Sequence, residues 1–229
     1  MATSSTPRLW HHTHPEATAH RTSVPTLVGR QGIFTARGVL CGYELLFRAA
    51  GLKGARADLW DAVDQDFATE HVIAAAFHQG TDVTSGRDAS VNFTGQYLLN
   101  HHDLYCDPKQ VIVEIVESTK VQDALIHRLR ELKILGFRIA LDDFVATDAQ
   151  CELLPFADFV KVDLNDIAEK GTWLMGHAYG EGRVLVAERV ETQEELQTAV
   201  ELGFDQFQGY FFERPDVLSI PRRQDPTPT

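Results

Sequence analysis

Short runs of β-branched and aromatic residues alternate with segments of helical periodicity along most of this 229-residue chain. Runs of the first kind, bounded by turn residues, are typical of buried strands. Strands that alternate with helices indicate a parallel sheet that is covered on both faces. Eight strands are predicted in this way: Thr26–Phe34, Val39–Phe47, Ala89–Phe93, Val111–Val116, Phe137–Leu141, Phe159–Val162, Val184–Val190 and Asp205–Phe212.

Helices are predicted between most of these strands. A long helix covers Leu59–Gln79, with Gly80 as its C-terminal stop. Thr192 and Glu195 form a capping box that opens another helix. A third helix ends at Gly136 and carries an apolar stripe at helical spacing, made of Val121, Leu125, Leu129 and Leu132.

The loop between the first two strands, Thr35–Gly38, is only four residues long. Four residues suit a hairpin and are too few for a parallel crossover, so we expect the first strand to run antiparallel to the second. Eight strands in about 200 residues fit an α/β fold, a modified TIM (β/α)8 barrel with an antiparallel first strand. A doubly wound open sheet is the alternative architecture, because a hairpin start suits it too.

Composition fits one soluble domain, with 44% hydrophobic and 24% charged residues. Residues 1–23 and 223–229 lack periodic apolar positions and are predicted to be flexible tails, which leaves 24–222 as the domain. A net charge of −12 argues against DNA or a membrane surface as a partner. Three cysteines without a Cys-x-x-Cys motif, and no apolar run of the ~20 residues that span a bilayer, predict a cytoplasmic location.

Polar residues recur at or near the C-terminal ends of the predicted strands, where barrel enzymes hold their catalytic groups. An unpaired charge inside apolar strand sequence is costly, so we expect these side chains to meet at one rim of the barrel. In isolation, adjacent aspartates are equally typical of a turn cap beside a solvated carboxylate, so the prediction rests on the whole set. The set is Glu44, Asn92, Glu114, Asp142, Asp143, Lys161, Glu188 and Gln208.

The residue types in this set define its chemistry. Carboxylate and amide oxygens without histidine or cysteine suit a hard cation, Mg²⁺ or Mn²⁺. The carboxylates exceed what one octahedral ion needs, and two ions ~3.5–4 Å apart bridged by an aspartate are a common solution for phosphodiester hydrolysis. Lys161 is expected to add positive charge or to orient the attacking water.

From about Val24 to Arg222 the chain resembles the EAL-type cyclic di-GMP phosphodiesterases of bacterial second-messenger signalling. This resemblance implies a modified TIM barrel and hydrolysis of cyclic di-GMP to linear pGpG by in-line attack of a metal-activated water. The family's motifs occur in order as Glu44-Leu45-Leu46 with Arg48, Asn92, Glu114 with Glu117, Asp142-Asp143-Phe144, Lys161-Val162-Asp163, Glu188-Arg189-Val190-Glu191-Thr192 and Gln208-Gly209-Tyr210.

The resemblance also implies a role for each matching residue. Lys161 and Glu188 would position and activate the water, with Glu188 as general base, and Glu117 would steady the loop after Asp143. The substrate would contact Gln31, Leu46, Arg48 and Gln208. Two Mg²⁺ or Mn²⁺ ions would be held by Glu44, Asn92, Glu114, Asp142 and Asp143.

The chain departs from the family pattern in three places, one of which is Gly32 in place of the proline of the family's opening Gln-Pro-Ile. Leu45 replaces the signature alanine, and Val145–Gln150 replaces a Gly/Ser-rich loop that in the family couples dimerisation to binding of the second metal. This loop and the short interval between Lys161 and Glu188 resemble the branch in which an EAL barrel precedes an HDOD domain, which we expect to be absent here. The altered loop leaves activity and a homodimer open. The alternatives are a catalytically weak or inactive cyclic di-GMP receptor that acts through a protein partner, and an unrelated metal-dependent barrel lyase.

Overall fold

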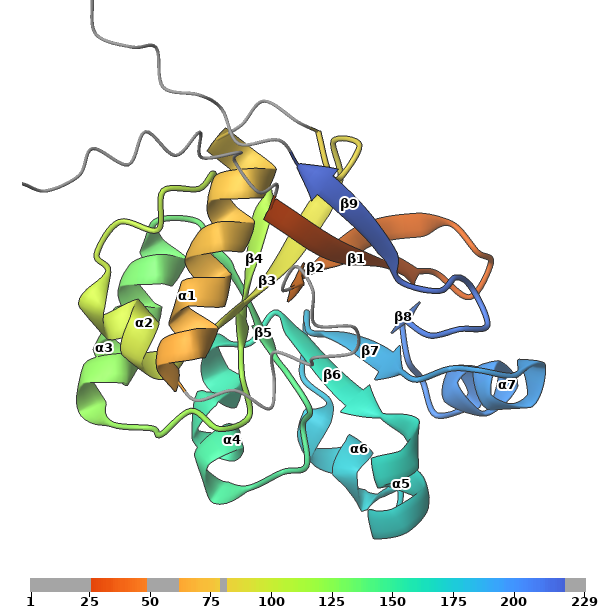
Figure 1. The fold of residues 1–229 in the computed structure, drawn as a ribbon. Coiled ribbons are helices and arrows are strands. Elements are labelled where there is room, and N and C mark those ends of the chain that lie inside the picture. Colours follow the sequence, from red (N-terminus) through yellow and green to blue (C-terminus); the bar gives the residue numbers. More distant parts are fainter. Residues whose placement is uncertain (1–25, 49–61, 79–81, 221–229) are drawn as a thin grey trace, which may run out of the picture.

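The computed structural model describes residues 26–48, 62–78 and 82–220 (Figure 1). The two tails predicted at 1–23 and 223–229, and the helix stop predicted at Gly80, lie outside the described residues. Among the helices that are described, none is long and apolar enough to cross a membrane.

Eight strands form a closed ring. Strands β2 to β8 follow one another in parallel, and β1 pairs antiparallel with both β2 and β8, which closes the barrel and excludes an open sheet. The strands are β1 (Thr26–Phe34), β2 (Leu40–Arg48), β3 (Asp88–Phe93), β4 (Val111–Ile115), β5 (Arg138–Leu141), β6 (Phe159–Asp163), β7 (Val184–Glu188) and β8 (Gln206–Phe207). The predicted barrel with an antiparallel first strand is confirmed.

The hairpin between β1 and β2 follows from its short loop. Gly38 has a φ of 75°, a left-handed conformation that glycine adopts without steric cost. The register that results places Gln31 of β1 opposite Glu44 of β2. The hairpin therefore sets two of the predicted site residues side by side.

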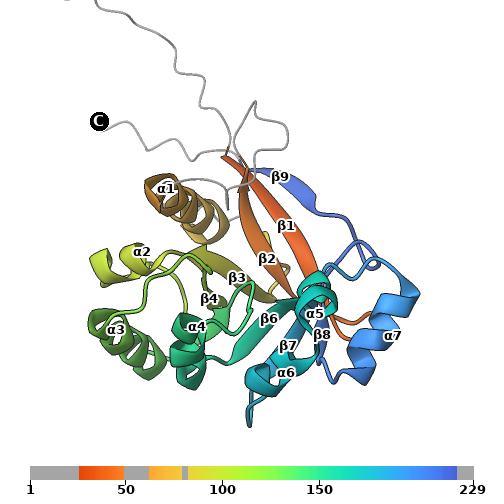
Figure 2. The ribbon, with the colours of Figure 1, turned by 90° about the horizontal axis from the view of Figure 1, so that it is seen from below.

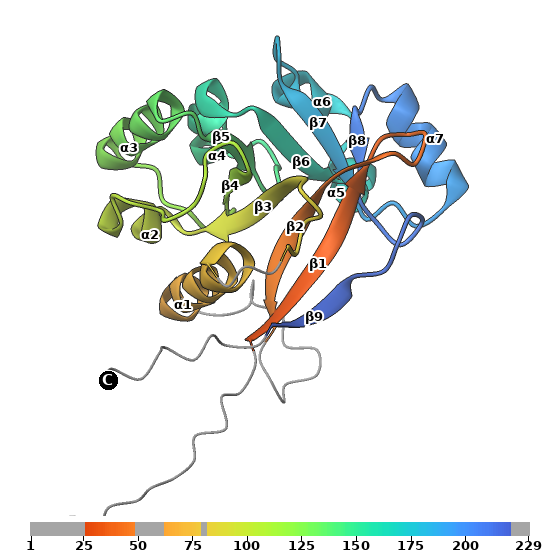
Figure 3. The same cartoon turned by 90° about the horizontal axis from the view of Figure 1, so that it is seen from above.

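The last predicted strand, Asp205–Phe212, is wrong in its extent, because β8 ends at Phe207. Gly209 adopts a φ of 155° and its backbone lies against Val190, which bends the chain away from the sheet. A ninth strand, β9 (Asp216–Ile220), was not predicted; it pairs antiparallel with β1 on the outside of the ring (Figure 3).

Helices cover the outside of the strands (Figure 2). The predicted capping box at Thr192 is present, since its hydroxyl accepts a hydrogen bond from Glu195 N while Glu195 reaches back to the cap. The short helices α2 and α4 were not predicted. The helices are α1 (Ala62–Ile73) with a π-helical continuation (Ala74–His78), α2 (Gly95–Asn100), α3 (Asp123–Ile134), α4 (Asp148–Leu153) with a 3-10 turn (Leu154–Phe156), α5 (Leu164–Lys170), α6 (Trp173–Ala178) and α7 (Gln193–Glu201).

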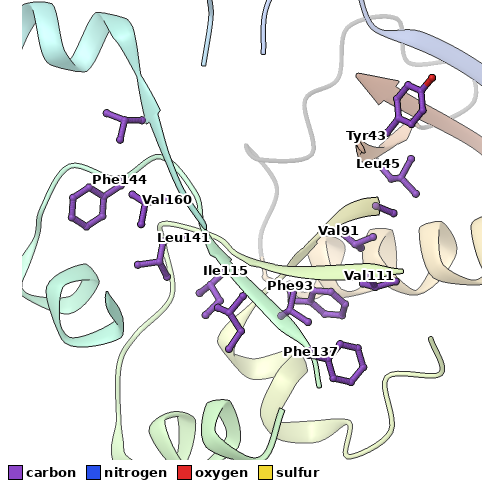
Figure 4. Close-up of a cluster of buried hydrophobic side chains, with 14 of the residues drawn as sticks. Tyr43, Leu45, Val91, Phe93, Val111, Ile115, Phe137, Leu141, Phe144 and Val160 are labelled. Atoms are coloured by element: carbon purple, nitrogen blue, oxygen red, sulfur yellow. The ribbon is translucent and has the colours of Figure 1, made fainter. Parts of the chain in front are cut away.

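The apolar core lies between the strands and these helices (Figure 4). Of the predicted helical stripe, Leu125, Leu129 and Leu132 lie on α3 and are fully buried, whereas Val121 precedes the helix and is partly buried. Phe93 of β3 and Phe144, which follows β5, are fully buried as well. This packing fixes the strand positions, and with them the polar side chains that project into the barrel.

Candidate active site

Lys161 of β6 is buried inside the barrel and is surrounded by carboxylates. Its Nζ lies 2.5 Å from Glu114 Oε1, 2.9 Å from Glu188 Oε1, 3.0 Å from Asp142 Oδ1 and 3.3 Å from Glu44 Oε2. These four carboxylates, here called the inner cluster, come from β2, β4, the end of β5 and β7. The structure thus brings together residues that are separated by more than 140 positions in the sequence, from Glu44 to Glu188.

Two amides complete the surroundings of Glu44. Gln208 Nε2 donates a hydrogen bond of 2.7 Å to Glu44 Oε2, and Asn92 Nδ2 lies 3.4 Å from Glu44 Oε1. In the parallel register of β3 and β4, Asn92 lies opposite Glu114, which places its amide beside the inner cluster. The amides orient the carboxylate while their own oxygens stay uncommitted.

Three buried oxygens in this group lack a hydrogen-bond partner within the described part of the chain: Asn92 Oδ1, Glu114 Oε2 and Gln208 Oε1. Buried polar atoms are nearly always paired, so an unpaired acceptor marks a place where another group binds. All three are oxygens, and the other atoms of the inner cluster that could bind a metal ion are carboxylate oxygens too. The set therefore fits a hard divalent cation.

A second group, here called the outer cluster, consists of Glu117, Asp142 and Asp143. One ligand atom from each of these residues lies within 4.8 Å of the others. Asp143 has a φ of 40°, in the left-handed region that residues other than glycine rarely adopt. Asp142 belongs to both clusters, so a cation held by the outer cluster would share a ligand with one held by the inner cluster.

The pKa values of the site reflect burial first. Burial raises the pKa of Glu114 and of Glu188, and the positive charge of Lys161 opposes this rise. Burial and the nearby Asp142 raise the pKa of Asp143 to about 6. Although burial favours a neutral amine, the surrounding carboxylates hold the pKa of Lys161 well above its usual range.

A cavity of about 410 Å³ opens above these groups, a volume typical of small-molecule sites. Of the predicted site residues, Glu114 and Lys161 do not line it; they lie behind lining residues that they contact. The others all line it: Gln31, Glu44, Leu46, Arg48, Asn92, Glu117, Asp142, Asp143, Glu188 and Gln208.

Several residues that support the site were not predicted. Thr69 donates a hydrogen bond of 2.6 Å to the backbone oxygen of Asn92, and Arg189 forms an ion pair of 2.9 Å with Asp163. Gln150 contacts the backbone next to Asp142 and Asp143. Gln150 carries a signal in the sequence, since Thr147-x-x-Gln150 is a capping-box pattern like the one found at Thr192.

Comparison with known proteins gives consistent matches. A family model described as the EAL domain matches residues 54–215. The cyclic di-GMP phosphodiesterase CdgJ of Vibrio cholerae is 37% identical over 202 residues, which cover 86% of this chain and 46% of the relative. The uncharacterized protein YuxH of Bacillus subtilis is 35% identical over 200 residues, which cover 84% of this chain and 48% of the relative. The chain therefore spans about half the length of these relatives.

Solved structures share the fold. The Klebsiella pneumoniae protein BlrP1, in a complex with manganese and cyclic di-GMP, has a TM-score of 0.68 at 23% identity, over 89% of this chain and 59% of that chain. The EAL-domain protein YkuI of Bacillus subtilis, in a complex with cyclic di-GMP and calcium, has a TM-score of 0.66 at 20% identity, over 86% of this chain and 56% of that chain.

Proposed function

The chain belongs to the EAL domain family, and from that premise we propose that it hydrolyses cyclic di-GMP to linear pGpG. One observation carries the proposal: four carboxylates from separate strands converge on Lys161 behind an open cavity, with unpaired oxygens among them. A relative named as a cyclic di-GMP phosphodiesterase, and similar structures that contain cyclic di-GMP with manganese or calcium, support the same substrate class.

We further propose that the site holds two divalent cations, Mg²⁺ or Mn²⁺. Glu44, Asn92, Glu114 and Asp142 would hold the first, and Asp142 with Asp143 the second. Bound cations of this kind stabilise negative charge on the phosphate and lower the pKa of water. The donor chemistry of these residues and the unpaired oxygens of Asn92 and Glu114 support this assignment.

The protein's own residues handle the proton and the substrate. Glu188 accepts a proton from the attacking water, and its raised pKa brings it closer to neutral pH, where a general base works best. Lys161 holds Glu188 and Asp142 in place through ion pairs. Gln31, Leu46, Arg48 and Gln208 line the cavity and would contact the dinucleotide, while Glu117 would steady the loop after Asp143.

The test is to incubate the protein with cyclic di-GMP and Mn²⁺ and to separate the products by chromatography. We expect pGpG with Mn²⁺ and none with excess chelator. Glu188→Gln keeps the size and hydrogen-bonding capacity of the side chain but removes the base, so we expect unchanged cyclic di-GMP binding and turnover reduced at least about a hundredfold.

Equal loss of binding and turnover in Glu188→Gln would contradict the role as base. Binding by the wild-type protein without turnover would identify the alternative, a cyclic di-GMP receptor. The homodimer, the protein partner and the limits of the domain at 24–222 stay predictions.

A further inference from the structure

The loop after Asp143 is held by one buried side chain. Gln150, on the first turn of α4, is 6% exposed. Its Oε1 accepts hydrogen bonds from Val145 N at 2.9 Å and from Thr147 N at 3.3 Å. Its Nε2 donates to the backbone oxygen of Asp143 at 3.0 Å and lies 3.4 Å from that of Asp142. A single amide therefore contacts four backbone groups of the segment that carries both aspartates.

This segment needs an external support because its backbone is strained. Asp143 and Ala146 have φ values of 40° and 57°, in the left-handed region that side chains other than glycine adopt at a cost. Such conformations persist only where surrounding contacts enforce them. Phe144 provides a second anchor, since its ring is fully buried and its N–H donates to the backbone oxygen of Lys161 at 2.9 Å.

We propose that Gln150 is a positioning residue for cation binding: it fixes the backbone from which Asp142 and Asp143 project. This inference rests on the proposed function, because it concerns the same two ligands. It also gives the altered loop Val145–Gln150 a role, since the glutamine provides a brace that glycine- and serine-rich sequence does not contain.

The second capping box explains why an amide is required. Glu195 on α7 accepts hydrogen bonds from Glu191 N at 2.7 Å and from Thr192 N at 2.9 Å. Both partners are donors, so a carboxylate satisfies them. Gln150 faces two donors and two carbonyl oxygens, and only a side chain with both an acceptor and an N–H donor can serve all of them.

The experiment measures Mn²⁺ binding by titration calorimetry in three proteins: wild type, Gln150→Met and Glu195→Met. Both variants lose the capping side chain of a helix, and both are expected to melt at a lower temperature. Only Gln150→Met should bind Mn²⁺ more weakly, by at least about tenfold, the effect typical of groups that orient metal ligands. In turnover assays, Gln150→Met should need correspondingly more Mn²⁺ for half-maximal rate and recover most of the rate at saturation.

Gln150→Glu separates geometry from charge. It keeps the acceptor toward Val145 and Thr147 but places an oxygen against the two carbonyl groups. An added negative charge alone would tighten cation binding, so weaker Mn²⁺ binding by Gln150→Glu can only come from lost geometry. We expect it to bind several-fold more weakly than wild type.

Wild-type affinity in a folded Gln150→Met or Gln150→Glu protein would overturn this inference and leave the proposed function intact. An equal loss of affinity in Glu195→Met would also overturn it, because any loss of a helix cap would then suffice. A wild-type protein that binds no Mn²⁺ would overturn the proposed function and this inference together.

Discussion

The inner and outer clusters share Asp142 but differ in how their charge is balanced. The inner cluster surrounds the ammonium group of Lys161, which forms ion pairs with all four of its carboxylates. In the outer cluster Asp143 has no ion pair among the residues that the structure describes, and the pKa of its carboxyl is raised to about 6. Glu44, Glu114 and Glu188 of the inner cluster lie on strands and Asp142 directly follows β5, whereas Asp143 and Glu117 lie in loops.

This difference separates two requirements of a cation site. A buried group of carboxylates destabilises the fold unless a positive charge compensates it, and Lys161 provides that charge from within the protein. The outer cluster instead keeps its geometry through the backbone of its loop, which Gln150 and Phe144 anchor. Changes to Lys161 should therefore affect folding first, whereas changes to the outer cluster should affect ion binding and its pH dependence.

The largest expected effect is that of Lys161→Met. Removing one partner of a buried ion pair leaves uncompensated charge and typically costs ~3–5 kcal/mol, and here four carboxylates lose their partner. We expect a loss of at least this size in the free energy of unfolding, measured with urea in the presence of a chelator. Added Mn²⁺ should offset part of the loss.

The matched control is Lys170→Met, which removes an ion pair with Asp166 on the exposed face of α5. It should unfold like the wild type, because exposed pairs contribute little. If Lys161→Met and Lys170→Met were equally stable in the presence of the chelator, Lys161 would not be the compensating charge of the inner cluster.

A smaller effect is expected for Gly209→Ala. Gly209 follows Gln208, which donates to Glu44 of the inner cluster, and a Cβ at this position would lie 2.1 Å from the backbone oxygen of Val190. The φ of 155° is also unfavourable for alanine. We expect a loss of about 1–3 kcal/mol in the free energy of unfolding, measured by urea denaturation.

Gly176→Ala provides the comparison, because nothing lies within 4 Å of a Cβ built at this helical glycine. It should leave stability unchanged or raise it by about 0.5–1 kcal/mol. Similar stability of the two variants would show that the contact between Gly209 and Val190 does not constrain the chain.

The smallest effect concerns Asp143 and pH. The pKa of its carboxyl rises from an ordinary value of 3.8 to about 6, so the folded protein holds a proton between these values that the unfolded chain has released. The free energy of unfolding of the metal-free protein should therefore fall as pH rises from about 4 to 6. Allowing for solvent screening of this half-buried group, the contribution of Asp143 to the fall is about 1 kcal/mol.

Asp143→Asn should remove this part of the pH dependence, because asparagine does not titrate and tolerates the left-handed backbone. Urea unfolding of both proteins at a series of pH values with a chelator measures the difference. If the stability of Asp143→Asn fell with pH as much as that of the wild type, the fall would come from other carboxyls. Asp143 would then not differ from the inner cluster in how its charge is balanced.

The residues of both clusters were named from the sequence, whereas the conformation of the loop that carries the outer cluster was not, for a physical reason. Glu44, Glu114 and Lys161 stand out because charge interrupts apolar strand sequence, and parallel register brings strand ends together. The loop after Asp143 carries no such signal: its shape depends on hydrogen bonds from Gln150 that only the folded chain reveals. The functional role of each residue stays a prediction.

The missed elements have similar causes. The helices α2 and α4 have six residues each, too few for a periodic pattern, although each begins after a capping threonine. Strand β9 pairs along β1 outside the ring, and its largely exposed side chains give no alternation to detect. The end of β8 depends on the close approach of Gly209 to Val190, a contact between distant positions.

Closure of the ring by β1 and β8, with β9 added along β1 outside it, has a consequence for how the protein forms during synthesis. The first strand pairs with β2 through the hairpin, but its other edge finds β8 and β9 only after the ribosome has released residues near 207 and 216–220. Gln208 reaches Glu44 only then. Until that moment β1 presents an unpaired edge on which two nascent chains can aggregate. Truncations that remove β8 and β9 should therefore yield insoluble protein rather than a smaller active barrel.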